Sequence, residues 1–145
     1  MAKGFDISMT GGKELQAKFS KLPIKMQRVL LRKALPAAAE PVAAAAVANA
    51  PTDTGALAAS IHVTKPKAVR GGLKVSIATG TRSDLGIAED ATGYYPMAQE
   101  CGWTDESGRQ HAGHPYMRPA LHQNEKGTLN IVGNAIASSM EELAK

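Results

Sequence analysis

At Ala50-Pro51-Thr52-Asp53-Thr54-Gly55-Ala56-Leu57-Ala58-Ala59-Ser60-Ile61 the chain leaves a long helix and approaches a strand. Pro51 ends the helix, because proline cannot donate a helical hydrogen bond and restricts the residue before it. The side-chain oxygen of Asp53 or Thr54 can cap a short turn, and Gly55 permits a close approach of the backbone. Two apolar side chains then return to the core, those of Leu57 and Ile61. Taken alone, the segment has the pattern of a helix-to-strand connector.

Two helices and a short strand are predicted before this segment. Apolar and polar residues alternate over residues 5–10, which favours a half-buried strand. The apolar residues of the first helix lie three or four apart on one face: Leu15, Phe19 and Leu22. Pro23 suits the first position of a second helix, which we expect to reach about residue 48. Pro36 and Pro41 inside it each remove a backbone donor and predict a kink or a short break.

The region after the segment combines strands, loops and a last helix. Alternating apolar residues on both sides of a turn at 70–72 predict an antiparallel hairpin: Ile61, Val63, Leu73, Val75 and Ile77. Residues 80–93 and 104–113 lack periodicity and are interpreted as mobile loops. Residues 94–103 hold the only tryptophan and two tyrosines, so burial is expected there. Pro119 can start a helix with an apolar stripe of Leu129, Val132, Ile136, Met140 and Leu143.

These elements predict an α+β fold, in which a small antiparallel sheet packs with a long, kinked N-terminal helix and a C-terminal helix. With 145 residues the chain has the length of one domain, residues 1–145, which can fold without metals or disulfides. Aromatic residues make up only 4% while alanine is abundant, so the core must pack through small and aliphatic side chains.

The sequence also indicates the cellular compartment in which the protein is assembled. A single cysteine, Cys101, excludes an internal disulfide, and the N-terminus lacks the apolar core of a secretory signal. We therefore expect assembly in a reducing cytoplasm. The most apolar stretch, residues 34–50, contains prolines and polar residues, and alanine transfers only weakly into lipid, so no membrane role is expected.

Charge is unevenly distributed along the chain. The net charge is +4, and residues 1–49 hold eight Lys/Arg against three Asp/Glu, whereas the remainder holds nine against ten. The cations recur at roughly helical spacing: Lys13, Lys18, Lys21, Lys25, Arg28, Arg32 and Lys33. They form either a solvated helix face or a surface for phosphate or an acidic partner. A basic nucleic-acid-binding protein is therefore an alternative function, although no aromatic residues interleave to stack bases.

Residues capable of catalysis or metal binding do not form a recognisable site. Cys101, His111 and His114 offer zinc-ligand chemistry, but a fourth ligand and paired-cysteine spacing are missing. A thiol nucleophile drawn from the same residues has no further support, and Cys101 in an apolar stretch is expected to be buried. Residues 11–13 lack the remainder of a phosphate loop. Solvated charges are expected at Asp84, Glu89 and Asp90. We therefore predict no enzyme, no metal and no cofactor.

Three separated blocks form a more specific pattern. The 50–61 segment is followed by Tyr95, Glu100 and Gly102, and then by His114-Pro115-Tyr116-Met117-Arg118-Pro119-Ala120-Leu121. In order and spacing these blocks resemble the tail-completion, or neck, proteins of long-tailed bacteriophages, a family that includes minor tail proteins of lambda-like phages. The resemblance extends over roughly residues 15–125.

This resemblance implies a structural role between the DNA-filled head and the tail. Subunits of such proteins form a ring around the channel, which implies a cyclic homo-oligomer, a hexamer by our expectation. It implies contacts with other phage connector and tail proteins and non-specific contact with channel DNA, in the neck or tail of the virion. No catalysis is implied. The matching positions are expected to define the fold or contact neighbouring subunits: Asp53, Thr54, Gly55, Leu57, Ser60, Glu100, Gly102, Met117, Arg118 and Pro119.

The chain departs from the family pattern in three places. Ala58 and Ala59 stand where basic residues are common, Trp103 replaces a small polar residue, and prolines interrupt the long helix. Arg118 is flanked by prolines, and its guanidinium suits pairing with a carboxylate. We hypothesise that it pairs with Glu100 and so fixes the last helix against the Glu100-Cys101-Gly102 segment.

Overall fold

The structure is a computed structural model that describes residues 12–52, 55–89 and 95–145. Its helices are α1 (Gly12–Ser20), α2 (Ile24–Asn49), α3 (Ala56–Ser60), α4 (Tyr95–Cys101) and α5 (Met117–Leu143). Its strands are β1 (His62–Val63), β2 (Lys67–Val69), β3 (Gly72–Lys74), β4 (Ile77–Ala78), β5 (Trp103–Thr104) and β6 (Gln110–His111). The predicted α+β class, with small antiparallel sheets beside long N-terminal and C-terminal helices, is confirmed.

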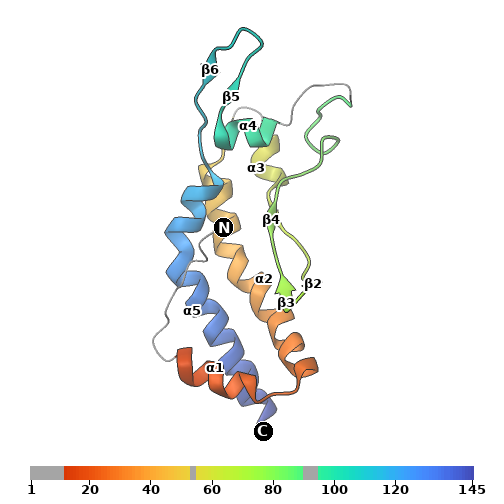
Figure 1. Ribbon diagram of the computed structural model, residues 1–145, viewed down its shortest axis with the longest axis vertical. Helices are drawn as coiled ribbons and strands as arrows, with labels where there is room; N and C mark the ends of the chain where they lie inside the picture. The colour runs from red at the N-terminus through yellow and green to blue at the C-terminus, as the bar shows by residue number, and fades with distance from the viewer. Residues whose placement is uncertain (1–11, 53–54, 90–94) are drawn as a thin grey trace.

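Helices α2 and α5 form the long axis of the molecule. Figure 1 shows them side by side and running in opposite directions, with α1 across one end and α4 at the other. Alanines occupy the most buried positions of this helix pair, namely Ala34, Ala38, Ala46 and Ala120, and Gly133 of α5 is buried as well. Because alanine and glycine add little bulk, the two backbones can approach closely. The expected reliance on small side chains is therefore confirmed.

Helix α2 is continuous from Ile24 to Asn49 despite its two prolines, so the expected short break does not occur. Each proline leaves the carbonyl four residues earlier without its helical donor, at Arg32 and Ala37. Both of those residues are exposed, and water can reach their surroundings. Pro23 lies one position outside the helix, where its carbonyl oxygen accepts hydrogen bonds from the backbone N–H groups of Met26 and Gln27.

The predicted hairpin before residue 80 is present and lies along α2 (Figure 1). Its outer ladder pairs β1 with β4, and its inner ladder pairs β2 with β3 around a turn at 70–71. The ladders differ by one residue in register, because Lys65 and Pro66 oppose Val75 alone. Proline has no N–H for the ladder, which explains a bulge at this position.

Other expectations are corrected by the structure. The second expected loop, 104–113, contains the β5–β6 hairpin. In the first, residues 80–89 include a turn in which Asp84 accepts hydrogen bonds from Thr81, and Leu85 is buried. Helix α5 begins at Met117, two residues before Pro119. The strand expected at 5–9 lies outside the described residues. None of the described helices combines the length and apolarity that crossing a membrane requires.

Candidate functional site

The three sequence blocks converge at the end of the molecule where α2 stops and α5 starts. The first block contributes buried Leu57 and Ile61, and the third contributes buried Tyr116 and Ala120. They pack on the last turns of α2, with Tyr95 of the second block and Met117 of the third against the same cluster. Segments far apart in the sequence therefore build one apolar junction.

Glycine is required at position 55 for its backbone conformation. Gly55 precedes α3 with a φ of 72°, in the left-handed region that other residues rarely adopt. A Cβ atom there would meet nothing within 4 Å, so the expected close backbone approach is not the reason for glycine. Asp53 and Thr54, the expected capping residues, lie outside the described residues. After the turn, the Ser60 hydroxyl donates to the carbonyl of Leu57 at 2.8 Å.

Glu100 holds the start of α5. Its Oε2 accepts the backbone N–H groups of Tyr116 at 2.8 Å and Met117 at 2.9 Å, and its Oε1 accepts that of Arg118 at 3.1 Å. The next residue, Pro119, has no N–H. The first four backbone N–H positions of a helix have no acceptor within it. Here three of them donate to Glu100, and the fourth belongs to proline, which has no N–H to satisfy. One carboxylate from α4 supplies the cap that a local side chain normally provides.

The protonation of Glu100 reflects this arrangement. Its side chain is only 13% exposed. Burial disfavours the charged form, but the backbone hydrogen bonds from Met117, Tyr116 and Arg118 outweigh it and lower the pKa of the carboxyl below its usual value. The positive end of the α5 dipole lies at the same place and favours an anion.

The hypothesised pair of Glu100 and Arg118 is present. Arg118 Nε lies 3.4 Å from Glu100 Oε1, and the arginine side chain is 66% exposed. This is one long contact rather than a bidentate pair, and exposed ion pairs contribute little. The backbone N–H groups therefore supply most of the attachment between α4 and α5.

Gly102 and Gly113 close the junction by backbone contact. Gly102 has a φ of +80°, and a Cβ atom on it would lie 2.5 Å from the carbonyl oxygen of His111. A Cβ on Gly113 would lie 2.5 Å from the nitrogen of Gly102. Beside this crossing, the backbone N–H of His114 donates to the carbonyl of Gln99 at 2.6 Å. Neither glycine tolerates a side chain without movement of the backbone.

The hairpin that leaves this crossing, residues 103–111, is called the arm below. The rings of Trp103 and His111 stack with centroids 4.1 Å apart and an interplanar angle of 9°. At the turn, Asp105 accepts hydrogen bonds from Ser107 and Arg109, and its Oδ2 lies 3.0 Å from His111 Nε2. The side-chain hydrogen bond from Ser107, followed by that from His111, lowers the pKa of Asp105. The arm is thus ordered by its own contacts.

Two expectations of burial at this end are wrong. Trp103 is 52% exposed and Met97 is 64% exposed, although their segment is rich in aromatic residues. Cys101 is also exposed. Near these exposed residues, Pro96 and Tyr116 are buried instead, and the Tyr116 hydroxyl donates to the carbonyl of Pro96 at 3.2 Å. In the sequence Tyr116 is marked only by its place in the 114–121 block, and no pattern singles out Gly113.

The candidate metal ligands do not gather into a site. His111 contacts Asp105, and within the described parts of the chain no three His, Cys, Asp or Glu side chains are placed to hold a metal ion. The described cations of the first third, from Lys13 to Lys33, are all exposed and lie on α1, on the turn after it and on the first half of α2. A second cationic group lies on the β2–β3 hairpin: Lys65, Lys67, Arg70 and Lys74, also exposed.

Comparison with known proteins identifies a family for this chain. A family model described as "Bacteriophage HK97-gp10, putative tail-component" matches residues 13–98, which include α1, α2, the hairpin and the start of α4. No curated protein and no solved structure gives a significant match. The family model covers more than half of the chain. The chain therefore belongs to the HK97-gp10-like family of bacteriophage tail components.

Proposed function

We propose that this tail component is a ring-forming subunit of the phage neck, acting as a head–tail connector or tail-completion protein. Its role is structural rather than catalytic, and its place is in the virion after assembly in the host cytoplasm. Family membership supports the tail assignment. The ring rests on the surface of the subunit itself.

Exposed apolar side chains carry this proposal. Large apolar residues are exposed at the α1 end and at the α4 end: Ile24 at 67%, Val29 at 54%, Leu143 at 53%, Met97 at 64% and Trp103 at 52%. Surfaces of this kind at both ends of one molecule mark contacts with other proteins. A closed cyclic oligomer, six-fold in our proposal, buries such surfaces without leaving a free end.

The junction residues fit this role as the rigid part of the subunit. We propose that Gly55, Leu57, Ser60, Glu100, Gly102, Met117, Arg118 and Pro119 fix the angle between helices, and that Asp53 and Thr54 belong to the same set. A repeated angle is what a ring requires. Native mass spectrometry of the full chain tests the ring: we expect one closed stoichiometry, and a monomer at all concentrations would contradict the proposal.

Contact with channel DNA is a second candidate activity, favoured by the β2–β3 hairpin. No Asp or Glu occurs between residues 54 and 83, and Lys67 lies directly opposite Lys74. Like charges in such a pair destabilise a hairpin, so the arrangement suits a polyanionic partner. Leu73 of β3 and Leu35 of α2 line one groove, which brings the hairpin close to the basic half of α2.

Duplex DNA binding in a salt series tests this activity. We expect weak binding that is lost at moderate salt, and a smaller salt dependence in a Lys67→Gln/Arg70→Gln variant. Substitution of Lys126, a cation on α5 away from the hairpin, serves as the control. Tight, salt-resistant binding by a monomer would instead favour the alternative of a dedicated nucleic-acid-binding protein.

A further inference from the structure

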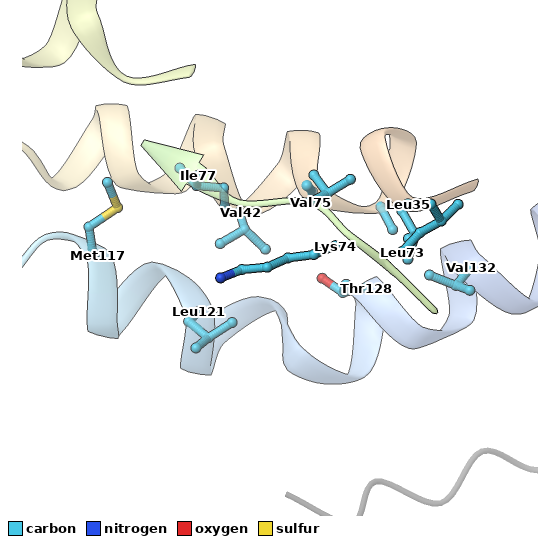
Figure 2. A pocket seen from close by; sticks show the side chains of 12 residues that line it. Leu35, Val42, Leu73, Lys74, Val75, Ile77, Met117, Leu121, Thr128 and Val132 are labelled. Carbon is cyan, nitrogen blue, oxygen red and sulfur yellow. The ribbon is translucent and has the colours of Figure 1, made fainter. Parts of the chain in front are cut away.

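The groove between α2, α5 and the β2–β3 hairpin is apolar with two polar groups in it. It has a volume of about 530 Å³, and its apolar walls include Leu35, Val42, Leu73, Leu121 and Val132. Figure 2 shows the Lys74 side chain lying along the groove, with the Thr128 hydroxyl facing it from α5. A groove of this size accommodates a bulky side chain.

Within the described residues, neither polar group has a partner. The Thr128 hydroxyl oxygen is buried and forms no hydrogen bond. A buried polar atom without a partner costs free energy, which a ligand can recover by bonding to it. Lys74 forms no ion pair with any described residue, and the other hairpin cations add to its positive potential. The groove therefore fits a partner with an apolar body, a hydrogen-bond donor and a negative charge.

The arm offers these three features together. Trp103 presents a half-exposed indole, whose N–H is a donor that requires an acceptor when buried. Glu106, three residues away, is an exposed carboxylate next to Asp105. The arm is also fixed in direction, because Gly102 and Gly113 lock its base and the Trp103–His111 stack orders its strands. A preorganised element loses little entropy on binding.

The arm cannot fill the groove of its own chain. Figure 1 shows β5 and β6 projecting beyond α4, away from the hairpin and the middle of α5. An arm in this position can reach only the groove of another molecule. Contacts between two different surfaces of identical subunits are the kind that close into rings.

We propose that the arm of one subunit docks in the groove between α2, α5 and the β2–β3 hairpin of the next subunit. Trp103 fills the apolar part and donates its indole N–H to Thr128, and Glu106 pairs with Lys74. The inference rests on the ring proposed above and adds its interface.

Variants with exchanged charges, measured by native mass spectrometry, test the contact. Trp103→Ala, Glu106→Lys and Lys74→Glu should each raise the concentration for half-assembly at least tenfold, and the double variant Glu106→Lys/Lys74→Glu should restore most of it. Val47→Ala, at an exposed apolar position on α2 outside the arm, the groove and the exposed apolar residues at the two ends, is the matched control and should assemble normally. Thermal unfolding of each variant as a monomer checks that the fold is unchanged. Unaltered assembly of Trp103→Ala, or no recovery in the double variant, would overturn the contact.

Photo-crosslinking separates the contact from the ring. With a benzophenone amino acid at position 103, we expect adducts between subunits on the peptide spanning 117–132. A ring of wild-type chains whose adducts fall elsewhere contradicts this contact alone. A wild-type chain that never assembles contradicts both the contact and the ring. Adducts on DNA instead of protein would assign the arm to the nucleic acid and likewise contradict the contact.

Discussion

The carboxylate of Glu100 accepts the backbone N–H of Tyr116 at 2.8 Å, across sixteen residues of chain. This bond and those to Met117 and Arg118 make α5 depend on α4 for its first turn. Arg118 adds only a long, exposed contact. The hypothesised pair of side chains is therefore the minor part of the contact. Glu100 chiefly binds the backbone N–H groups at the start of α5.

Removal of the Glu100 carboxylate is expected to destabilise the protein by about 1–3 kcal/mol, because three backbone donors lose a charged acceptor. Arg118→Ala should cost less than about 1 kcal/mol, since exposed ion pairs contribute little. Urea unfolding of Glu100→Ala and Arg118→Ala measures both values, with Glu40→Ala as an exposed control. Equal losses for the two variants would contradict the dominance of the backbone bonds.

The same carboxylate is expected to contribute to the pH dependence of stability. Its pKa is lower in the folded chain than in the unfolded chain, so the folded state binds this proton less tightly. The contribution is fully present above the ordinary pKa that this carboxyl has in the unfolded chain. It is lost as the pH falls through the lower folded pKa. The stability difference between wild type and Glu100→Gln should therefore shrink in acid, as urea unfolding across pH can measure; a constant difference would contradict this assignment.

Gly102 and Gly108 provide a matched pair at the arm. Both have positive φ, of +80° and +82°, but only Gly102 has backbone atoms in the place of a Cβ. Gly108→Ala should cost about 1–2 kcal/mol for the left-handed conformation alone. Gly102→Ala should cost more, because the crossing with Gly113 must also open. Comparable thermal unfolding of the two variants would show that the crossing is not rigid.

Alanine positions on α2 test the close packing of the helices. Ala46 has an exposed fraction of 0%, while Ala44, two residues earlier, is exposed. Ala46→Leu should destabilise the protein by about 1–3 kcal/mol through overpacking. Ala44→Leu should leave stability nearly unchanged, since leucine and alanine are both good helix formers. Chemical denaturation of both variants decides whether the helices lie as close as the structure shows.

Patterns that depend on neighbouring residues predicted the fold well. The spacing of Leu15 and Phe19 located α1, although the helix ends at Ser20, before Leu22. The alternation around residues 70–72 located the hairpin. The arm was missed because its strands are two residues long, too short for any periodicity. The continuity of α2 through Pro36 and Pro41 depends on where solvent meets the helix, which local sequence does not reveal.

The sequence predicted which residues form the junction, but it did not predict the hydrogen bonds that hold them together. Sequence reasoning paired Glu100 with Arg118, but the N–H groups of α5 that Glu100 accepts have no sequence signature at a distance of sixteen residues. The prediction that Trp103 is buried was wrong. Aromatic residues favour contact with another protein surface, and that surface need not belong to the same chain.

The alanine contact between α2 and α5 has a mechanical consequence. Alanine has no side-chain rotamers to rearrange, so at Ala34, Ala38, Ala46 and Ala120 the two helices cannot yield to a load by repacking side chains. A force applied at the α4 end would therefore move the α1 end as part of the same rigid body. A tail component built in this way carries force along its length with little change in its own shape.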